Sequence, residues 1–427
     1  MTTFKQVKSL KGTVRVPSDK SISHRSFMFL SMAKGRGRII DPLLSADTKA
    51  TMAAMQSVGV QFEETVDGFV VTSEGYKNFR EPDNVIDCMN SGTTARLLSG
   101  VFAPSGKYVV LTGDASLRKR PMDRVIQPLS AMGVQFAARN NGSLLPMTIL
   151  PSKTHPADII ATAKSAQVKS AVLLAGIQTD GVTTYTEKAV TRNHTEIMLS
   201  ALGANIKTEG LKITVEGAAD LRSMDIVVPG DFSSAAFFLG AALMFENSEL
   251  MLENVGLNPT RSGMLTVLEN MGVKYALENE RGGAEKLGDI IISSQPFKGC
   301  EIEGDIIANI IDELPMIATL GLFADSPVTI RNAKELRVKE SDRIMATLHN
   351  LNALGAETEE FEDGMKIYPI KKVNSKAELK SFDDHRIAMI AIMLAKRFGG
   401  DISVDNVHCV DVSFPTFMET FSALEAK

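Results

Sequence analysis

Lysine and arginine residues stand at the start of several strongly apolar stretches of this sequence. Lys20 and Arg25 precede the run Phe27–Leu30, and Arg386 precedes the run Ile387–Ala395. A helix start is already positive, because its first N–H groups are unpaired and its dipole points that way, so cations there need a negative partner. These positions predict sites for small anions, and phosphate and carboxylate groups are the natural ligands of such side chains.

The polar segment Asn90–Arg96 has the composition of a ligand cradle. Gly92 lets the backbone approach a ligand closely because it has no side chain, and Arg96 lies in the opening turns of the apolar stretch that follows. Lys20 and Ser21 could suggest a nucleotide-binding P-loop, but the glycines which that loop requires are absent. We therefore do not expect a nucleoside triphosphate as ligand.

Two further segments are dense in charge. Arg118–Arg124 holds four cations, which form either a solvated surface run or a phosphate clamp, since arginine offers paired donors to phosphate and carboxylate oxygens. Arg337–Arg343 mixes cations with Glu340 and Asp342, which either pair along one helix or face a substrate. Both alternatives stay open for each segment on the sequence alone.

Carboxylates lie among these cations and give the segments a capacity for proton transfer. Asp312 adjoins Glu313, and Glu340 follows Lys339, so these groups could act as acids and bases if the fold brings them to a substrate. No metal-ligand cluster, nucleophile elbow or cofactor fingerprint occurs in the sequence. We expect no metal and no cofactor.

The bulk composition argues against several functions. The net charge of −5 leaves no global basic field for nucleic acid or an anionic membrane surface. The longest apolar run, Ala235–Phe245, is far shorter than the roughly 20 residues that span a bilayer. The three cysteines are isolated from one another, which fits a reducing compartment. We expect a cytoplasmic protein with neither nucleic acid nor a membrane as partner.

Two periodic signals indicate how the chain positions these residues. A glycine that ends an apolar turn recurs after roughly 70 residues, at Gly59, Gly133, Gly203, Gly272 and Gly355. A polar cluster suited to a helix start recurs at nearly the same interval, and its copies are anchored on Asp19, Asn90, Ser165, Asp231, Asp312 and Asp384. We interpret these signals as six copies of one α/β unit, divided between two domains.

The stretches after three of these clusters are apolar on almost every face, at Ala235–Phe245, Leu314–Phe323 and Ile387–Ala395. Helices of this kind are buried all round, so their polar ends must be satisfied by caps, water or a ligand. Parallel helices in one domain would bring these ends to one surface and create an anion site. The alternative is that each cluster only caps its own helix.

Six segments, in order along nearly the whole chain, resemble those of the 5-enolpyruvylshikimate-3-phosphate (EPSP) synthases, particularly the second bacterial class. They are Asp19–Arg25, Asn90–Thr93, Arg120–Asp123, Ser165–Lys169, Arg337–Arg343 and Asp384–Arg386. The resemblance implies an inside-out α/β barrel of two domains, each with three βαβαββ units around buried parallel helices. It implies an upper domain of residues 14–229, a lower domain of residues 1–13 and 230–427, and an active site in the cleft between them. We expect a monomer.

The reaction implied by this resemblance moves the enolpyruvyl group of phosphoenolpyruvate to the 5-hydroxyl of shikimate-3-phosphate and releases phosphate. The residues implied to hold shikimate-3-phosphate are Lys20, Ser21, Arg25, Ser165, Gln167, Asp312 and Lys339. Those implied to hold phosphoenolpyruvate are Lys20, Gly92, Arg120, Arg343 and Arg386, and Asn90 and His385 belong to the same binding motifs. Asp312 would take the hydroxyl proton and Glu340 would deliver a proton to carbon, with Lys20 assisting.

Three positions depart from the family pattern. Many relatives have a second serine at the position of Ala166, an asparagine near Glu335 and a lysine near Val412. Our hypothesis is that Lys169 or Arg192 replaces the missing donor and charge.

Two other functions fit part of the pattern. The enolpyruvyl transferases that act on UDP-N-acetylglucosamine share the fold and the chemistry, but they generally carry a cysteine at the position of Asp114, before the Arg-Pro pair. A non-catalytic binding protein for phosphorylated sugars or acids could use the same repeat. Such a protein would have no need of Asp312, Glu340 and Lys20 together.

Overall fold

The computed structural model describes residues 1–426 and divides the chain into two compact units. Unit 1 comprises Met1–Pro17, Gly230–Arg281 and Lys286–Lys427, and unit 2 comprises Ser18–Pro229 and Gly282–Glu285. The expected division, 14–229 against 1–13 with 230–427, differs from these bounds at residues 14–17 and 282–285.

Unit 2 contains three four-stranded sheets. The first, in the order β14-β3-β5-β4, has strands β3 (Lys34–Ile40), β4 (Gln61–Thr65), β5 (Gly68–Glu74) and β14 (Ile226–Val227). The second, β6-β7-β9-β8, has strands β6 (Ile86–Asp87), β7 (Val109–Thr112), β8 (Gln135–Ala138) and β9 (Leu144–Leu150). The third, β10-β11-β13-β12, has strands β10 (Asp158–Ile160), β11 (Val182–Thr186), β12 (Ile206–Glu209) and β13 (Lys212–Glu216).

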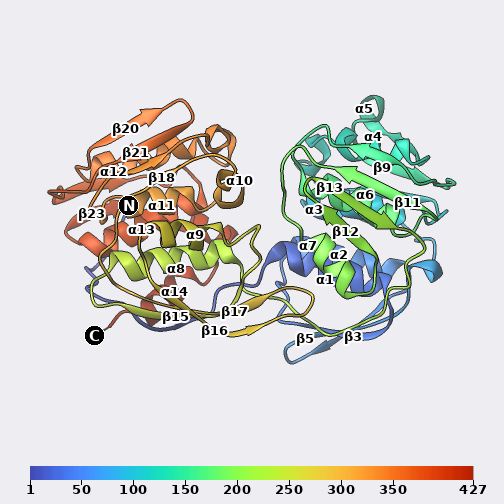
Figure 1. Cartoon of the computed structure of the whole chain (residues 1–427), viewed down its shortest axis with the longest axis horizontal. Helices are drawn as coiled ribbons and strands as arrows, with labels where there is room; N and C mark the ends of the chain where they lie inside the picture. The colour runs from blue at the N-terminus through green and yellow to red at the C-terminus, as the bar shows by residue number, and fades with distance from the viewer. Residues whose placement is uncertain (427) are drawn as a thin grey trace. The chain divides into compact units, whose positions relative to one another are not determined.

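The helices of unit 2 lie beside these sheets (Figure 1). They are α1 (Lys20–Met32), α2 (Ala46–Ser57), α3 (Gly92–Phe102), α4 (Asp123–Ala131), α5 (Arg139–Gly142), α6 (Ala166–Gly176) and α7 (His194–Ala201), with the 3-10 turns η1 (Tyr76–Asn78) and η2 (Leu117–Lys119). Nearly every residue of α1, α3 and α6 is buried, so these three form the centre of the unit.

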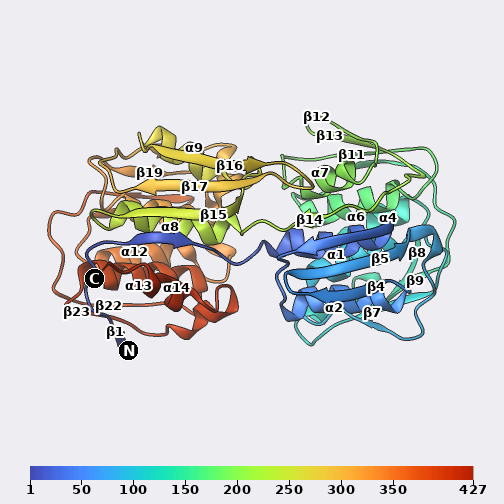
Figure 2. The same cartoon turned by 90° about the horizontal axis from the view of Figure 1, so that it is seen from below.

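Unit 1 also has three sheets, one of which is three-stranded. The sheet β16-β17-β15-β2 has strands β2 (Lys11–Val14), β15 (Glu249–Gly256), β16 (Tyr275–Arg281) and β17 (Leu287–Ser293). The sheet β18-β19-β21-β20 has strands β18 (Glu301–Ile302), β19 (Val328–Ile330), β20 (Thr358–Phe361) and β21 (Gly364–Ile367). The sheet β1-β23-β22 has strands β1 (Thr2–Thr3), β22 (Lys376–Leu379) and β23 (Asp401–Val404). The N-terminal strand β2, blue in Figure 2, lies beside β15.

The central helices of unit 1 lie between its sheets (Figure 1). The helices of the unit are α8 (Phe232–Met244), α9 (Gly263–Asn270), α10 (Ile306–Ile310), α11 (Leu314–Leu320), α12 (Arg343–Ala353), α13 (His385–Phe398) and α14 (Phe417–Ala423), with the 3-10 turns η3 (Lys334–Val338) and η4 (His408–Val412). Every residue of α8 and of α11 is buried, as the apolar stretches predicted.

The sheets confirm six copies of one α/β unit. In five of them, one edge strand is parallel to its neighbour and the other two neighbouring pairs are antiparallel. The sixth repeats this order with β22 parallel and β1 antiparallel to β23. All five predicted glycine stops have a positive φ, as at Gly59 with φ +100°, which is a conformation that suits glycine at a helix end.

The predicted helix starts are confirmed in all six copies, and in four of them the anchoring residue is itself the N-cap. Asp19, Ser165, Asp231 and Asp384 are N-cap residues whose side chains accept backbone N–H groups. In the second copy the cap is Ser91 rather than Asn90, whose amide binds other side chains. In the fifth copy Asp312 is not a cap, because α11 begins after Glu313, and Glu313 makes no side-chain capping bond. Over residues 1–426, no helix is long and apolar enough to cross a membrane.

Candidate active site

Arg25 is an enclosed cation on the opening turns of α1 in unit 2, where it is 3% exposed. Its Nε donates to Thr195 Oγ1 at 2.8 Å, Nη2 donates to Ser170 Oγ at 2.9 Å, and Nη1 donates to the carbonyl oxygen of Ser21 at 3.0 Å. Burial lowers the pKa of Arg25 to about 10, although nearby carboxylates oppose this effect. The side chain therefore keeps its charge at neutral pH, and its hydrogen bonds fix its orientation.

Two other predicted residues of unit 2 stand at helix starts. Lys20 opens α1, is about half exposed on its side chain and donates to the carboxylate of Asp47 on the first turn of α2. Ser165 precedes α6, and its Oγ accepts the N–H of Val168 at 3.4 Å. Capping thus explains Ser165, whereas the exposure of the Lys20 side chain leaves its charge accessible to an anion.

The starts of α3 and α6 bring four predicted residues together. Arg96 Nη1 donates to Gln167 Oε1 at 2.6 Å, and Arg120 Nη2 donates to Asn90 Oδ1 at 2.7 Å. A side chain on Gly92 would place its Cβ 2.9 Å from Arg96 Nη1 and 3.6 Å from Arg120 Nη1. Asn90, Gly92, Arg120 and Gln167 therefore surround one spot, with Arg96 beside them.

These guanidinium groups of unit 2 repel one another. Burial, followed by the charges of Arg124 and Arg120, lowers the pKa of Arg96 to about 10. An anion bound here would relieve this repulsion, since opposite charges stabilise the protonated form. The interpretation of Arg118–Arg124 as part of a phosphate site fits this geometry for Arg120.

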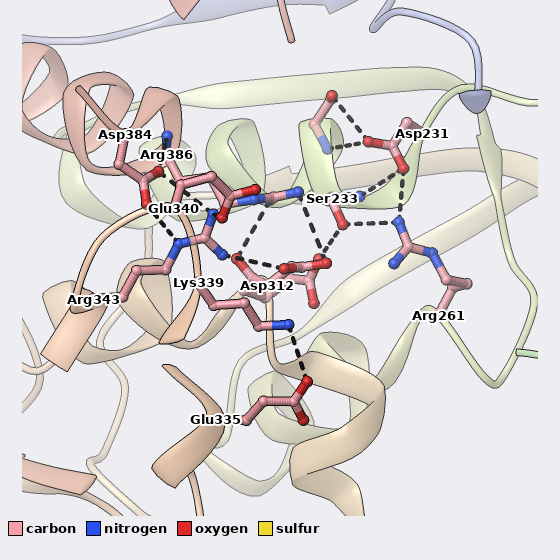
Figure 3. A network of polar contacts seen from close by, with 12 residues as sticks. Asp231, Ser233, Arg261, Asp312, Glu335, Lys339, Glu340, Arg343, Asp384 and Arg386 are labelled. Atoms are coloured by element: carbon pink, nitrogen blue, oxygen red, sulfur yellow. Dashed lines mark hydrogen bonds and ion pairs between the residues drawn. The ribbon is translucent and has the colours of Figure 1, made fainter. Parts of the chain in front are cut away.

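In unit 1, Arg343 is the centre of a network of carboxylates (Figure 3). It is fully buried, and its nitrogen atoms lie 3.2 Å from Asp312 Oδ1, 2.6 Å from Glu340 Oε2 and 2.8 Å from Asp384 Oδ2. One guanidinium thus holds the two carboxylates that the sequence proposes for proton transfer. In this conformation the Arg343 guanidinium therefore binds protein carboxylates and is not exposed to an external anion.

Asp384 balances the charge of this buried arginine. Burial acts to raise the pKa of Asp384, but the hydrogen bond and the charge of Arg343 outweigh burial and hold that pKa below its ordinary value. Arg386, the second residue of α13, lies beside Asp312: its Nη1 donates to the carbonyl oxygen of Asp312 at 3.4 Å, and Nη2 is 4.0 Å from Oδ2. Predicted residues from three separate segments thus meet in unit 1.

Glu313 is a buried acid behind Asp312. It accepts a short hydrogen bond from Ser233 Oγ, which in turn accepts from Arg261 Nη2 at 2.8 Å. Arg261 also binds Asp231 Oδ1 at 2.8 Å (Figure 3). Burial, and to a smaller degree the charge of Asp312, raises the pKa of Glu313. Glu313 therefore anchors the chain around Asp312, which remains the more accessible of the two acids.

The remaining predicted residues of unit 1 lie at the edge of this network. Lys339 Nζ is 3.5 Å from Glu335 Oε1, and the side chains are 22% and 70% exposed, so this ion pair is weak. His385 opens α13, and burial followed by the charge of Arg386 lowers its pKa below the ordinary value. His385 is therefore expected to be neutral at pH 7.

The sequence placed Arg96 in the predicted cradle and Asp384 at a predicted helix start, but it did not assign either residue a contact. It did not single out Arg261 at all. Arg261 comes from the loop before α9, far from every motif, and no local pattern in the sequence points to it.

Of the two residues suggested to replace the lost donor at Ala166, Lys169 is wrong. Its Nζ is 2.6 Å from Glu196 Oε1 and 3.2 Å from Glu187 Oε2, and its side chain is 1% exposed. A lysine enclosed by two carboxylates cannot also serve an external phosphate. Arg192 fits better, because it is close enough to Arg25 for its charge to lower the pKa of Arg25.

No group of three or more His, Cys, Asp or Glu side chains in the described part of the chain is arranged to hold a metal ion. The titratable groups found together in unit 1 are matched by arginines instead. The arrangement can bind anions and move protons.

Comparisons with known proteins agree with this geometry. The family model for EPSP synthase (3-phosphoshikimate 1-carboxyvinyltransferase) matches residues 4–421. The 3-phosphoshikimate 1-carboxyvinyltransferase of Oceanobacillus iheyensis is 44% identical over 97% of both chains, and that of Bacillus subtilis is 41% identical over 99% of both. The EPSP synthase structure from Acinetobacter baumannii has a TM-score of 0.94 and 38% identity, covering 99% of this chain and 97% of that one. The chain belongs to the EPSP synthase family.

Proposed function

We propose that the residues gathered in unit 1 and unit 2 act together on one pair of substrates. As a member of its family, the chain is a 3-phosphoshikimate 1-carboxyvinyltransferase: it transfers the enolpyruvyl group of phosphoenolpyruvate to the 5-hydroxyl of shikimate-3-phosphate and releases phosphate. Both substrates are anions, so a site rich in arginine and lysine lowers the repulsion between them. The roles of individual residues, and a location of the reaction between the units, are part of our proposal.

Shikimate-3-phosphate is assigned to the helix starts around Arg25. Arg25 and Arg192 supply charge to its phosphate, and Ser21, Ser165 and Gln167 supply neutral donors and acceptors. Lys339 and Asp312 contact the ring from unit 1. The support for this assignment is the fixed, charged state of Arg25 within a set of hydroxyl groups.

Phosphoenolpyruvate is assigned to Arg120 beside Gly92 and to Arg386, with Lys20 shared between the substrates. Asn90 orients Arg120, and His385 offers a neutral imidazole at the start of α13. Arg343 contacts this substrate only if one of its carboxylate partners moves away. Its first task in our proposal is therefore to hold Asp312 and Glu340.

The proton steps follow from that arrangement. Asp312 accepts the proton of the 5-hydroxyl while the hydroxyl oxygen bonds to C2 of phosphoenolpyruvate. Glu340 donates a proton to C3, and a tetrahedral adduct results. Glu340 then removes a proton from the new methyl group as the C–O bond to phosphate breaks, and Asp312 returns its proton to the departing phosphate. Lys20 stabilises the developing negative charge. The observation that carries this proposal is the shared contact of Asp312 and Glu340 with one buried arginine.

A phosphate-release assay tests the function and separates it from the alternatives. The protein is mixed with shikimate-3-phosphate and phosphoenolpyruvate in the presence of a chelator, and we expect release of one phosphate per product formed. Release with UDP-N-acetylglucosamine in place of shikimate-3-phosphate would select the related transferase. Binding of both substrates without phosphate release would select a non-catalytic binding protein.

We also propose that the protein acts as a monomer in the cytoplasm. Every residue assigned above comes from a single chain. The three cysteines, Cys88, Cys300 and Cys409, are free thiols, which supports a reducing compartment.

A further inference from the structure

The connection between β16 and β17 is shared between the two units. Both strands belong to unit 1, but four of the five residues that join them, Gly282–Glu285, belong to unit 2. Ala284 is 4% exposed and is part of the hydrophobic core of unit 2, and Glu285 is 3% exposed. A turn between two strands is ordinarily exposed, as Gly282 and Gly283 are here, so the burial of Ala284 and Glu285 requires an explanation.

Glu285 is buried against the first residue of α7. Its Oε1 lies 2.7 Å from His194 Nδ1, and each side chain is 1% exposed. A hydrogen bond to a carboxylate is strong and directional, and the loss of such a bond is costly where water cannot replace it. The contact therefore fixes the position of His194 relative to the turn.

The first turn of α7 also controls Arg25. Thr195, which follows His194, accepts the hydrogen bond from Arg25 Nε at 2.8 Å, and its Oγ1 lies 2.7 Å from Ser170 Oγ, the second partner of Arg25. Glu196, the next residue, is held by Lys169 at 2.6 Å. Three successive residues of α7 thus contact three different elements, and Glu285 is one of the contacts that fix this turn.

We propose that Glu285 is a positioning residue for the shikimate-3-phosphate subsite: it holds the first turn of α7 through His194, and that turn orients Arg25. This inference rests on the proposed assignment of Arg25 to shikimate-3-phosphate. Glu285 lies in the connection between β16 and β17, outside every motif identified in the sequence. The short segment Gly282–Glu285, far along the chain from the rest of unit 2, therefore contributes to substrate binding in that unit.

The alternative is that Glu285 acts only through its charge. Its carboxylate is close enough to Arg25 to raise the pKa of that guanidinium. Loss of this negative charge would make the subsite more positive, and a purely electrostatic role predicts tighter binding of an anionic substrate. A positioning role predicts weaker binding when the contact is lost. The two explanations therefore differ in sign.

The test uses the full-length enzyme and steady-state phosphate release. Glu285→Ala removes both charge and contact, and Glu285→Gln removes the charge but keeps an oxygen that His194 Nδ1 can donate to. We expect E285A to raise the KM for shikimate-3-phosphate about fivefold or more, since a buried charge-assisted hydrogen bond is lost. The KM for phosphoenolpyruvate should change much less, and E285Q should stay within about twofold of the wild type because its hydrogen bond persists.

Partner and control variants make the test specific. H194A should reproduce the effect of E285A, and H194N, whose amide can occupy the position of Nδ1, should restore a low KM. Glu278 on β16 is an exposed carboxylate of the same hairpin, so E278A should match the wild type. Hydrogen exchange of the α7 amides should accelerate in E285A and H194A but not in E278A, and this readout does not depend on turnover.

The outcomes separate this inference from the proposed function. A lower or unchanged KM for shikimate-3-phosphate in E285A, or an equal rise for both substrates, overturns the positioning role. If E285A does not fold, the KM values of H194A and H194N for the two substrates test the positioning role instead. If the wild type releases no phosphate, the proposed function fails, while the exchange of the α7 amides still reports whether Glu285 fixes the turn.

Discussion

Many relatives have a serine at the position of Ala166, so this chain has one hydroxyl donor fewer at the start of α6. Lys169 and Arg192 differ in their ability to replace that donor. Lys169 is enclosed by Glu187 and Glu196, so its charge is neutralised inside the protein. Arg192 is partly exposed and its charge acts on Arg25. Both residues are cations, so the difference between them lies in how far each side chain is buried and in the groups that it contacts.

The substitution R192A should raise the KM for shikimate-3-phosphate about tenfold, which corresponds to one charged hydrogen bond. Its free energy of unfolding should change by less than about 1 kcal/mol, because the side chain is only partly buried. The contrasting variant K169M leaves two buried carboxylates without their cation and should lose about 3–5 kcal/mol of stability. Substrate saturation curves and urea denaturation give both quantities. An unchanged KM in R192A would remove Arg192 from the site.

At the scale of the element, the buried helices explain why the chemistry lies at their starts. α1, α3 and α6 are enclosed along their length, and their lysine and arginine side chains all lie within the first two turns. Each start must satisfy free N–H groups, and its dipole favours an anion. Serine or aspartate caps meet part of this need, and the cations next to the caps require negative partners, which are protein carboxylates for Lys169 and a bound anion in our proposal for Arg25.

Gly92 is the point where α3 leaves room for such an anion. In G92A the new Cβ would lie 2.9 Å from Arg96 Nη1 and 3.6 Å from Arg120 Nη1, so the flexible ends of these side chains must shift. We expect a several-fold rise in the KM for phosphoenolpyruvate. Stability should hold or increase by up to about 1 kcal/mol, because alanine favours a helix over glycine.

The variant S91A provides the comparison for G92A. It removes the N-cap of α3, where Ser91 Oγ accepts the N–H of Thr94 at 3.0 Å, and it should cost about 1 kcal/mol of stability. Its effect on the KM for phosphoenolpyruvate should be smaller than that of G92A. A wild-type KM in G92A would show that this position does not contact the substrate.

At the scale of the whole molecule, the N-terminal segment is an integral part of unit 1. β2 pairs in parallel with β15, and Leu10 and Val14 are fully buried in the core of that unit. β1 pairs with β23 in another sheet of the same unit. Unit 1 therefore requires both ends of the sequence, and two of its sheets are completed only by residues from the N-terminal segment.

Deletion of residues 1–14 should destabilise unit 1 by about 5 kcal/mol or more, because the buried side chains of Val7, Leu10 and Val14 and two strand pairings are lost. Unit 2 should keep its fold, since none of its sheets contains β1 or β2. Hydrogen exchange resolved by peptide can follow the two units separately. Deletion of residues 1–3 is the control, because it removes only β1. Equal protection of unit 1 in both truncations would contradict the prediction.

Local patterns in the sequence were sufficient to predict the repeat and the ends of its helices. Apolar runs such as that of α8 predict burial because a helix without a polar face has no stable exposed arrangement. Glycine stops such as Gly59 were confirmed because few other residues adopt a positive φ at little cost. Composition does not reveal which residue of a cluster caps its helix, because backbone geometry decides it: Ser91 rather than Asn90 caps α3, and Asp312 does not cap α11.

Tertiary structure decided which charged residues meet and which are already neutralised. The sequence predicted Asp312, Glu340 and Arg343 as site residues, but only packing places both carboxylates on one buried guanidinium. Lys169 and Arg192 look alike in sequence, and only their three-dimensional surroundings separate a buried ion pair from a substrate ligand. The contact of Glu285 with His194 joins residues far apart along the chain. Residue type and spacing determine the local chemistry of this protein, whereas the pairing of distant charges depends on packing between repeats that no local pattern encodes.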